Sequence, residues 1–196
     1  LIFVSEYFSE EVMDDYGIMI RDNGFSVIHN PIDTDRFTYR KKSPKDRFRI
    51  LSIRTFASAK YANDISVNAI IELSERKDFE RLDFLIIGDG ALFEEVTTPL
   101  ADMDNVTLNR GFLSNDEYER IFDEYGIFLT PTRWDSQGVG RDEAMACGVV
   151  PATNRISAIP EFADDSCAIL ADPEDFKGLA AGIGELIDDS KLFMKK

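Results

Sequence analysis

Short apolar runs alternate with longer amphipathic stretches through most of the chain. The runs are rich in Ile, Leu, Val and Phe, and two of them are nearly unbroken, as is typical of strands covered on both faces. The candidate strands are residues 49–53, 82–87, 106–108, 127–130, 149–153 and 168–170. Strands that alternate with helices predict a mostly parallel sheet, so we expect a three-layer α/β/α Rossmann-like domain.

The stretches between these strands have helical periodicity. Apolar side chains recur three or four positions apart in residues 63–75 and 176–187, which predicts one buried face on each helix. Ser114 and Glu117 have the spacing of a capping box, which marks the start of another helix. Residues 191–196 are expected to follow the last helix.

The first 30 residues have a different pattern. Residues 1–5 and 26–29 are predicted short strands, and residues 9–16 form a predicted short acidic helix. A polar stretch at residues 38–47 separates this part from the first strand of the main sheet. Because the chain begins with Leu1 rather than Met, we expect it to be a fragment of a longer protein.

Composition narrows the functional classes. The 196 residues are 44% hydrophobic, which is enough for one well-buried core, and they carry a net charge of -15. So acidic a surface repels a polyphosphate backbone and argues against nucleic acid as a partner. The single histidine, His29, excludes a His-based triad and makes a zinc site unexpected. Cys147 and Cys167 are predicted to be buried, reduced thiols of a cytoplasmic protein.

Candidate binding residues follow the predicted strands. Ligands of such sheets bind beyond the carboxyl ends of the strands, so the loops there are the place to look. Arg54 and Lys60 follow the first main strand and can clamp a diphosphate. Taken singly, these cations and the turn at Gly88 and Gly90 would be interpreted as ordinary surface features.

The glycine-containing segment at residues 138–148 is more specific. Its glycines allow the backbone to approach a ligand, and a helix is predicted to begin beside Arg141. The amides and the dipole of that helix start favour a phosphate. Asp135 and Glu143 flank the loop with seven residues between them, and their carboxylates can accept hydrogen bonds from sugar hydroxyls.

This loop resembles the E-x7-E signature of a large family of retaining glycosyltransferases that includes sucrose, trehalose and bacterial polysaccharide enzymes. Asp135 stands where the signature has a glutamate, and Ser136 and Gln137 replace its usual Gly–aromatic pair. The likeness runs through the chain in the family's order, in segments 29–33, 52–54, 87–90, 111–114, 143–148 and 159–161. The resemblance implies the GT-B architecture of two facing Rossmann-like lobes.

The resemblance also implies a division of the chain and roles for its residues. Residues 1–24 would be the tail of the N-terminal acceptor lobe and linker, and residues 25–196 the nucleotide-sugar-binding lobe without its final crossing helix. Arg54 and Lys60 would stabilise the leaving diphosphate, and Asp135 would contact the donor hexose. Further donor-binding residues would be Gly88, Gly90, Gly111, Phe112, Leu113, Ser136, Gln137, Gly138, Val139, Gly140, Arg141 and Glu143.

The implied function is retaining transfer of a hexose from a UDP- or GDP-hexose to a saccharide or lipid-linked acceptor. No metal or other cofactor is expected, because cations and amides would take up the charge of the diphosphate. The resemblance places the full-length protein in the cytoplasm, in polysaccharide or glycolipid assembly at the inner face of a membrane. Two alternatives stay open: a non-catalytic nucleotide- or partner-binding module, and a sugar-nucleotide epimerase of the same architecture.

Overall fold

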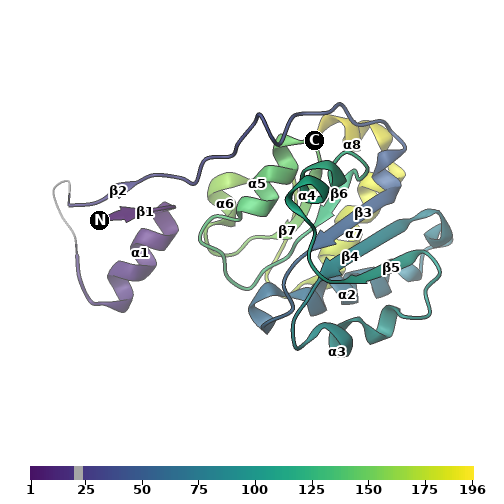
Figure 1. Cartoon of the computed structure of the whole chain (residues 1–196), viewed down its shortest axis with the longest axis horizontal. Coiled ribbons are helices and arrows are strands. Elements are labelled where there is room, and N and C mark those ends of the chain that lie inside the picture. Colours follow the sequence, from purple (N-terminus) through teal and green to yellow (C-terminus); the bar gives the residue numbers. More distant parts are fainter. Residues whose placement is uncertain (20–23) are drawn as a thin grey trace.

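A six-stranded parallel sheet forms the centre of the protein. The structure, a computed structural model, describes residues 1–19 and 24–196, and Figure 1 shows this sheet with helices packed around it. The strand order is β5-β4-β3-β6-β7-β8, and every neighbouring pair is parallel. The strands are β3 (Arg49–Ile53), β4 (Asp83–Gly88), β5 (Val106–Arg110), β6 (Ile127–Leu129), β7 (Val150–Asn154) and β8 (Ile169–Ala171). The predicted α/β class and parallel sheet are confirmed.

Alternating side chains explain why the strands are apolar throughout. Ile50 faces a core shared with α2 and α7, whereas its neighbour Leu51 faces a second core shared with α4 and α5. In β6, Ile127 and Phe128 divide between the same two cores. Side chains of a strand point alternately to opposite faces, so a strand with both faces covered must be apolar at nearly every position.

The helices cover both faces and agree largely with the prediction. The helix predicted at 63–75 ends at Ser74, and the Ser114–Glu117 capping box is present. A short helix, α8, replaces the non-helical end predicted for residues 191–196, because Asp189 accepts the amides of Lys191 and Leu192 at 2.8 and 3.1 Å. The helices are α2 (Asn63–Ser74), α3 (Phe93–Thr97), α4 (Asn115–Ile121), α5 (Val139–Ala146), α6 (Ile159–Phe162), α7 (Phe176–Asp188) and α8 (Ser190–Lys195), with short 3-10 turns at Asp46–Phe48, Ala59–Tyr61, Phe79–Arg81 and Thr98–Leu100.

The N-terminal segment lies to one side of this body (Figure 1). Strands β1 (Ile2–Phe3) and β2 (Ser26–Val27) pair in parallel, and helix α1 (Glu6–Asp15) connects to β1. The helix starts before the predicted residue 9, because the Ser5 hydroxyl caps it by accepting the Phe8 amide at 3.2 Å. Of the predicted first-lobe segment 1–24, residues 20–23 lie outside the described residues.

Two further predictions concern cysteine and the membrane. Cys147 is buried as predicted, but Cys167 is only half-buried, because it follows an exposed turn in which its sulfur contacts the Asp164 carbonyl. Neither is in a disulfide. Among the described residues, no helix combines the length and the apolar character needed to cross a bilayer.

Candidate functional site

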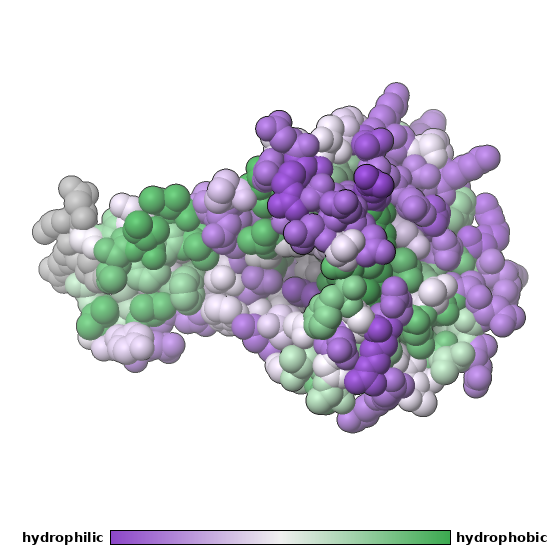
Figure 2. Space-filling model, viewed as in Figure 1, coloured by the Kyte–Doolittle hydropathy of each residue, from purple (hydrophilic) through white to green (hydrophobic). Residues whose placement is uncertain are grey.

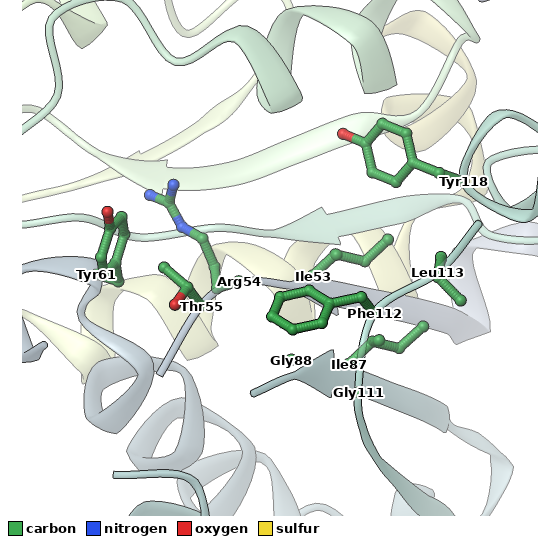
Figure 3. Close-up of a pocket in the computed structure, with 10 residues that line it drawn as sticks. All are labelled: Ile53, Arg54, Thr55, Tyr61, Ile87, Gly88, Gly111, Phe112, Leu113 and Tyr118. Atoms are coloured by element: carbon green, nitrogen blue, oxygen red, sulfur yellow. The ribbon is translucent and has the colours of Figure 1, made fainter. Parts of the chain in front are cut away.

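The loops that follow the strands enclose a cavity of about 320 Å³ at the carboxyl edge of the sheet (Figure 3). Tyr61 and Arg54 lie at one end of it, and Leu113 and Tyr118 lie at the other. The wall between them is largely apolar, with Ile53 and Ile87 from β3 and β4. The predicted donor-binding residues that line this cavity are Arg54, Gly88, Gly111, Phe112 and Leu113.

Gly88 and Gly90 allow two loops at this edge to pack closely together. A Cβ atom at Gly88 would lie 1.8 Å from the carbonyl oxygen of Arg54, and one at Gly90 would lie 2.3 Å from the carbonyl carbon of Phe56. The glycines therefore let the β4 loop pack directly against the loop after β3. Gly88 also borders the cavity, whereas Gly90 does not.

Arg54 also forms the wall of a second, smaller hollow of about 60 Å³. There its Nη1 lies 3.8 Å from a carboxylate oxygen of Asp135. Burial lowers the pKa of the Arg54 guanidinium, and the charge of Asp135 opposes that shift. The Nε of Arg54 is buried without a hydrogen-bond partner in the part of the chain that the structure describes. The predicted residues that line this hollow with it are Asp135, Gly138, Val139, Gly140 and Arg141.

The start of α5 closes the small hollow. Gly138 occupies the N-cap position at φ +94°, a left-handed conformation that favours glycine, and no side chain caps the helix. Uncapped first-turn amides are available to an anion. Arg141 is buried beneath this turn, where it donates to the Gln137 carbonyl at 2.7 Å and pairs with Asp142 at 2.6 Å.

The structure turns Gln137 away from both cavities. Its amide oxygen accepts the Asn30 amide at 2.7 Å, and its amide nitrogen donates to the Asn30 carbonyl at 3.0 Å. The same nitrogen donates to Asp142 at 3.1 Å. Gln137 therefore braces the segment that leads into the main body, and the geometry does not support its predicted donor contact. Ser136 is half-buried and lines neither cavity.

Glu143 reaches the larger cavity only through another side chain. Its carboxylate accepts a hydrogen bond of 2.7 Å from the hydroxyl of Tyr118, and Tyr118 lines the cavity. Burial raises the pKa of the Glu143 carboxyl, although this hydrogen bond opposes the shift. Asp135 and Glu143 thus do not share one cavity. Arg54, which lines both cavities, lies between the two regions.

Tyr118 was missed as a site residue because its position in the sequence marks it only as part of a helix's apolar stripe. Tyr61 was missed too, and it connects the two predicted cations. The Arg54 guanidinium lies 5.7 Å from the centroid of the Tyr61 ring, and the Lys60 ammonium lies 5.8 Å from it. Lys60 is exposed, and its ammonium also lies 4.3 Å from the ring centroid of Trp134. The two cations therefore flank one ring.

Comparisons with known proteins identify relatives of this chain. An uncharacterized 41.2 kDa protein in the cps region of Klebsiella pneumoniae is 24% identical over 84% of the chain and 45% of its own length. An MMP alpha-(1->4)-mannosyltransferase from Mycolicibacterium hassiacum is 23% identical over 97% of the chain and 46% of its own length. The chain therefore spans about half the length of these curated relatives.

Solved structures share the fold. The chain superimposes on a TarM variant from S. aureus, solved with fondaparinux, alpha-GlcNAc-glycerol and UDP, with a TM-score of 0.81 and 14% identity. The match covers 99% of this chain and 38% of that protein. At this level of identity the likeness shows the fold.

The family model for glycosyl transferases group 1 matches residues 47–189, which contain the whole six-stranded sheet and both cavities. The match and the superposition agree with the parallel α/β fold. The chain therefore belongs to the glycosyl transferases group 1 family and has the Rossmann-like fold of a lobe of a GT-B glycosyltransferase.

Proposed function

We propose that this chain binds a nucleotide-diphosphate sugar at the carboxyl edge of its sheet. The observation that carries the proposal is the position of Arg54, which lines both the large apolar-walled cavity and the small polar hollow. The large apolar-walled cavity suits the base of a nucleoside, and the small polar hollow suits the hydroxyls of a sugar. The diphosphate that joins the nucleoside to the sugar would then pass the Arg54 guanidinium. The UDP in the TarM complex fits a donor of this class.

In this proposal, each part of the donor has its own residues. Gly111, Phe112 and Leu113 face the base, and Glu143, together with Tyr118, meets the ribose at the far wall. Arg54, Lys60 and the uncapped amides of α5 hold the diphosphate. Asp135 accepts hydrogen bonds from the hexose hydroxyls.

The proposed reaction is retaining transfer of the hexose. The bond between the anomeric carbon and the diphosphate oxygen breaks, and the electron pair leaves with the diphosphate. A new bond forms to an acceptor hydroxyl, whose proton passes to the departing diphosphate. Charge therefore accumulates on the departing diphosphate. Arg54, Lys60 and the α5 amides would stabilise that charge without a metal, because fixed positive groups in a site that excludes water stabilise developing anions.

The acceptor would be a saccharide or a lipid-linked saccharide bound by a second lobe. We propose that residues 1–24 belong to that lobe. Figure 2 shows apolar side chains gathered over the N-terminal segment, while hydrophilic ones cover much of the main body in this view. The exposed apolar residues there include Leu1, Ile2, Ile18 and Met19, and a two-stranded sheet with such a surface normally needs further packing.

Isothermal titration calorimetry with UDP, GDP, UDP-hexose and GDP-hexose tests the proposal. We expect binding of at least one of these nucleotides and a loss of at least tenfold in affinity in the Arg54→Ala, Lys60→Ala double variant. The matched control, Arg81→Ala with Lys177→Ala, also removes two cations, neither of which lines either cavity, and it should bind as the unaltered chain does. Equal affinity in the two double variants would remove the proposed site.

A further inference from the structure

Lys60 is held in place by aromatic rings. Its ammonium lies 4.3 Å from the centroid of the Trp134 ring and 5.8 Å from that of Tyr61. Within residues 1–19 and 24–196, no carboxylate forms a salt bridge with Lys60. The neighbouring Arg133, in contrast, forms salt bridges with both Asp64 and Glu174. A cation over a ring face is held weakly in water. Lys60 is therefore positioned but remains available to an anion.

Trp134 is fixed by a residue from the start of the chain. Its indole Nε1 donates to both carboxylate oxygens of Glu11 in α1, at 2.8 Å each. The ring of Phe8, one turn earlier in α1, meets the indole edge-to-face with the centroids 5.8 Å apart. A carboxylate on the indole N–H draws positive charge to that side of the ring system, which leaves the face richer in electrons for Lys60.

A second contact fixes α1 against the main body. The carboxylate of Glu161, from α6, accepts the backbone amides of Glu6 and Tyr7 at 2.9 and 2.7 Å. These are first-turn amides of α1, which have no partner inside the helix. An anion at this end also complements the helix dipole. With Glu161 at its first turn and Trp134 at its middle, α1 cannot shift without moving one of the two.

We infer that Trp134 is a positioning residue for Lys60, and that α1 sets the position of Trp134 through Glu11. The inference rests on the proposed role of Lys60 at the diphosphate. Glu11, Trp134 and Lys60 form a continuous chain of an anion, an indole and a cation that starts in the N-terminal segment and ends beside the larger cavity. A movement of α1 relative to the main body therefore changes the diphosphate affinity of the site.

The first test needs no nucleotide. Trp134 is the only tryptophan of the chain, so its indole N–H gives a single resonance in a ¹H–¹⁵N spectrum. We expect that resonance to move in Glu11→Gln, which weakens its acceptor, and in Lys60→Ala, which removes the cation from the ring. Lys177→Ala, on α7, is the control and should leave it in place. An indole resonance that is unchanged in Lys60→Ala would overturn the inference.

The second test is a double-mutant cycle on UDP and GDP affinity. Trp134→Leu should weaken binding about two- to fivefold, the size of one exposed cation–π contact, and should have no further effect in a Lys60→Ala background. Trp134→Phe keeps a ring under the ammonium and should retain most of the affinity, which separates positioning from misfolding. Additive losses would overturn the inference alone. Failure of the unaltered chain to bind either nucleotide would instead contradict the proposed function.

Discussion

Tyr118 and Glu143 show how the role of a residue depends on its partner. The carboxylate of Glu143 is half-buried and reaches the site through the Tyr118 hydroxyl. The sequence places Glu143 in the first turns of a helix that follows a glycine loop, and from this it predicts a polar contact. It does not reveal that a tyrosine 25 positions earlier in the chain would take one of the carboxylate oxygens.

A pH-dependent stability is expected at Glu143. Burial raises its pKa in the folded state, so the folded protein binds this proton more tightly than the unfolded chain does. Stability is therefore lost as pH rises from the unfolded value of about 4.3 through the raised folded value. Glu143→Gln removes this loss. The melting temperature of the variant minus that of the unaltered chain should therefore increase from pH 4 to pH 7.

Thermal unfolding at several pH values measures the effect. The Tyr118→Phe variant provides an internal check, because the Tyr118 hydrogen bond opposes the rise in the Glu143 pKa. Without that bond, stability should depend on pH more steeply. A difference between Glu143→Gln and the unaltered chain that stays constant from pH 4 to pH 7 would contradict the expected coupling.

The Arg54–Asp135 pair should contribute to stability as well as to binding. Their side chains are 18% and 22% exposed, so Asp135→Asn leaves a largely buried guanidinium without its nearest carboxylate. We expect a loss of about 1–3 kcal/mol in the free energy of unfolding, measured by urea denaturation. The same change at Asp165, which pairs with Arg155 on the surface, should cost less than about 1 kcal/mol. Equal losses would argue against a stabilising role for the pair.

Among the elements, the strands and helices of the main body were largely predictable, and the loops between them were not. The strand of residues 49–53 was predicted with the bounds it has in the structure, because a strand buried on both faces leaves a continuous apolar run. Helix α8 was missed, since its stability depends on Asp189 as a cap and on burial of Phe193. Short helices such as α3 and α6 also give too few turns for a clear period.

The close contact between the loops after β3 and β4 predicts that a side chain larger than hydrogen at Gly88 destabilises the protein. An alanine there would place its Cβ 1.8 Å from the Arg54 carbonyl oxygen and 2.8 Å from the Phe56 ring, so the strand ends must separate. We expect Gly88→Ala to lower the free energy of unfolding by about 1–3 kcal/mol or more. It should also weaken nucleotide binding, because Arg54 and Gly88 line the same cavity.

Gly140→Ala is the matched control for stability. It lies in the first turn of α5, and its Cβ would meet the Tyr118 hydroxyl at 3.2 Å. Alanine also has the higher helix propensity, so we expect little change in the free energy of unfolding. Urea denaturation gives the free energy of unfolding of both variants. A Gly88→Ala variant as stable as Gly140→Ala would show that the loops do not need this close packing.

For the molecule as a whole, the expected division of labour between two lobes can be tested directly. We expect the chain alone to bind a UDP- or GDP-hexose weakly and to transfer no sugar, because the acceptor would lie on the other lobe. Release of UDP or GDP and formation of a glycosylated product are the measurements. Transfer by the chain alone at the rate of a two-lobed relative would contradict this expectation.

The same assay on a two-lobed protein that contains this chain separates the enzyme from the non-catalytic alternative. A two-lobed protein of this kind that binds a donor but neither hydrolyses nor transfers it would favour a binding module. Asp135, one methylene shorter than the glutamate of the family signature, is the residue to restore in that case. Asp135→Glu should then bring activity back if the shorter side chain is the cause.

The sequence by itself determined the class of fold and the edge of the sheet where the candidate site lies. Both follow from local rules: alternation buries strand faces, helical spacing buries one helix side, and parallel strands present their carboxyl ends at the same edge. Arg54, Gly88, Gly111 and Asp135 could therefore be placed near one another before the structure was known, and it brings them to that edge.

Only the tertiary structure decided which of the nearby side chains line a cavity and which brace the chain. Gln137 pairs with Asn30, which is 107 positions away, and Trp134 pairs with Glu11, which is 123 positions away. The direction of a loop side chain depends on such distant partners, because a loop lacks the regular backbone that fixes side-chain direction in a strand or helix. No local pattern in the sequence encodes those contacts.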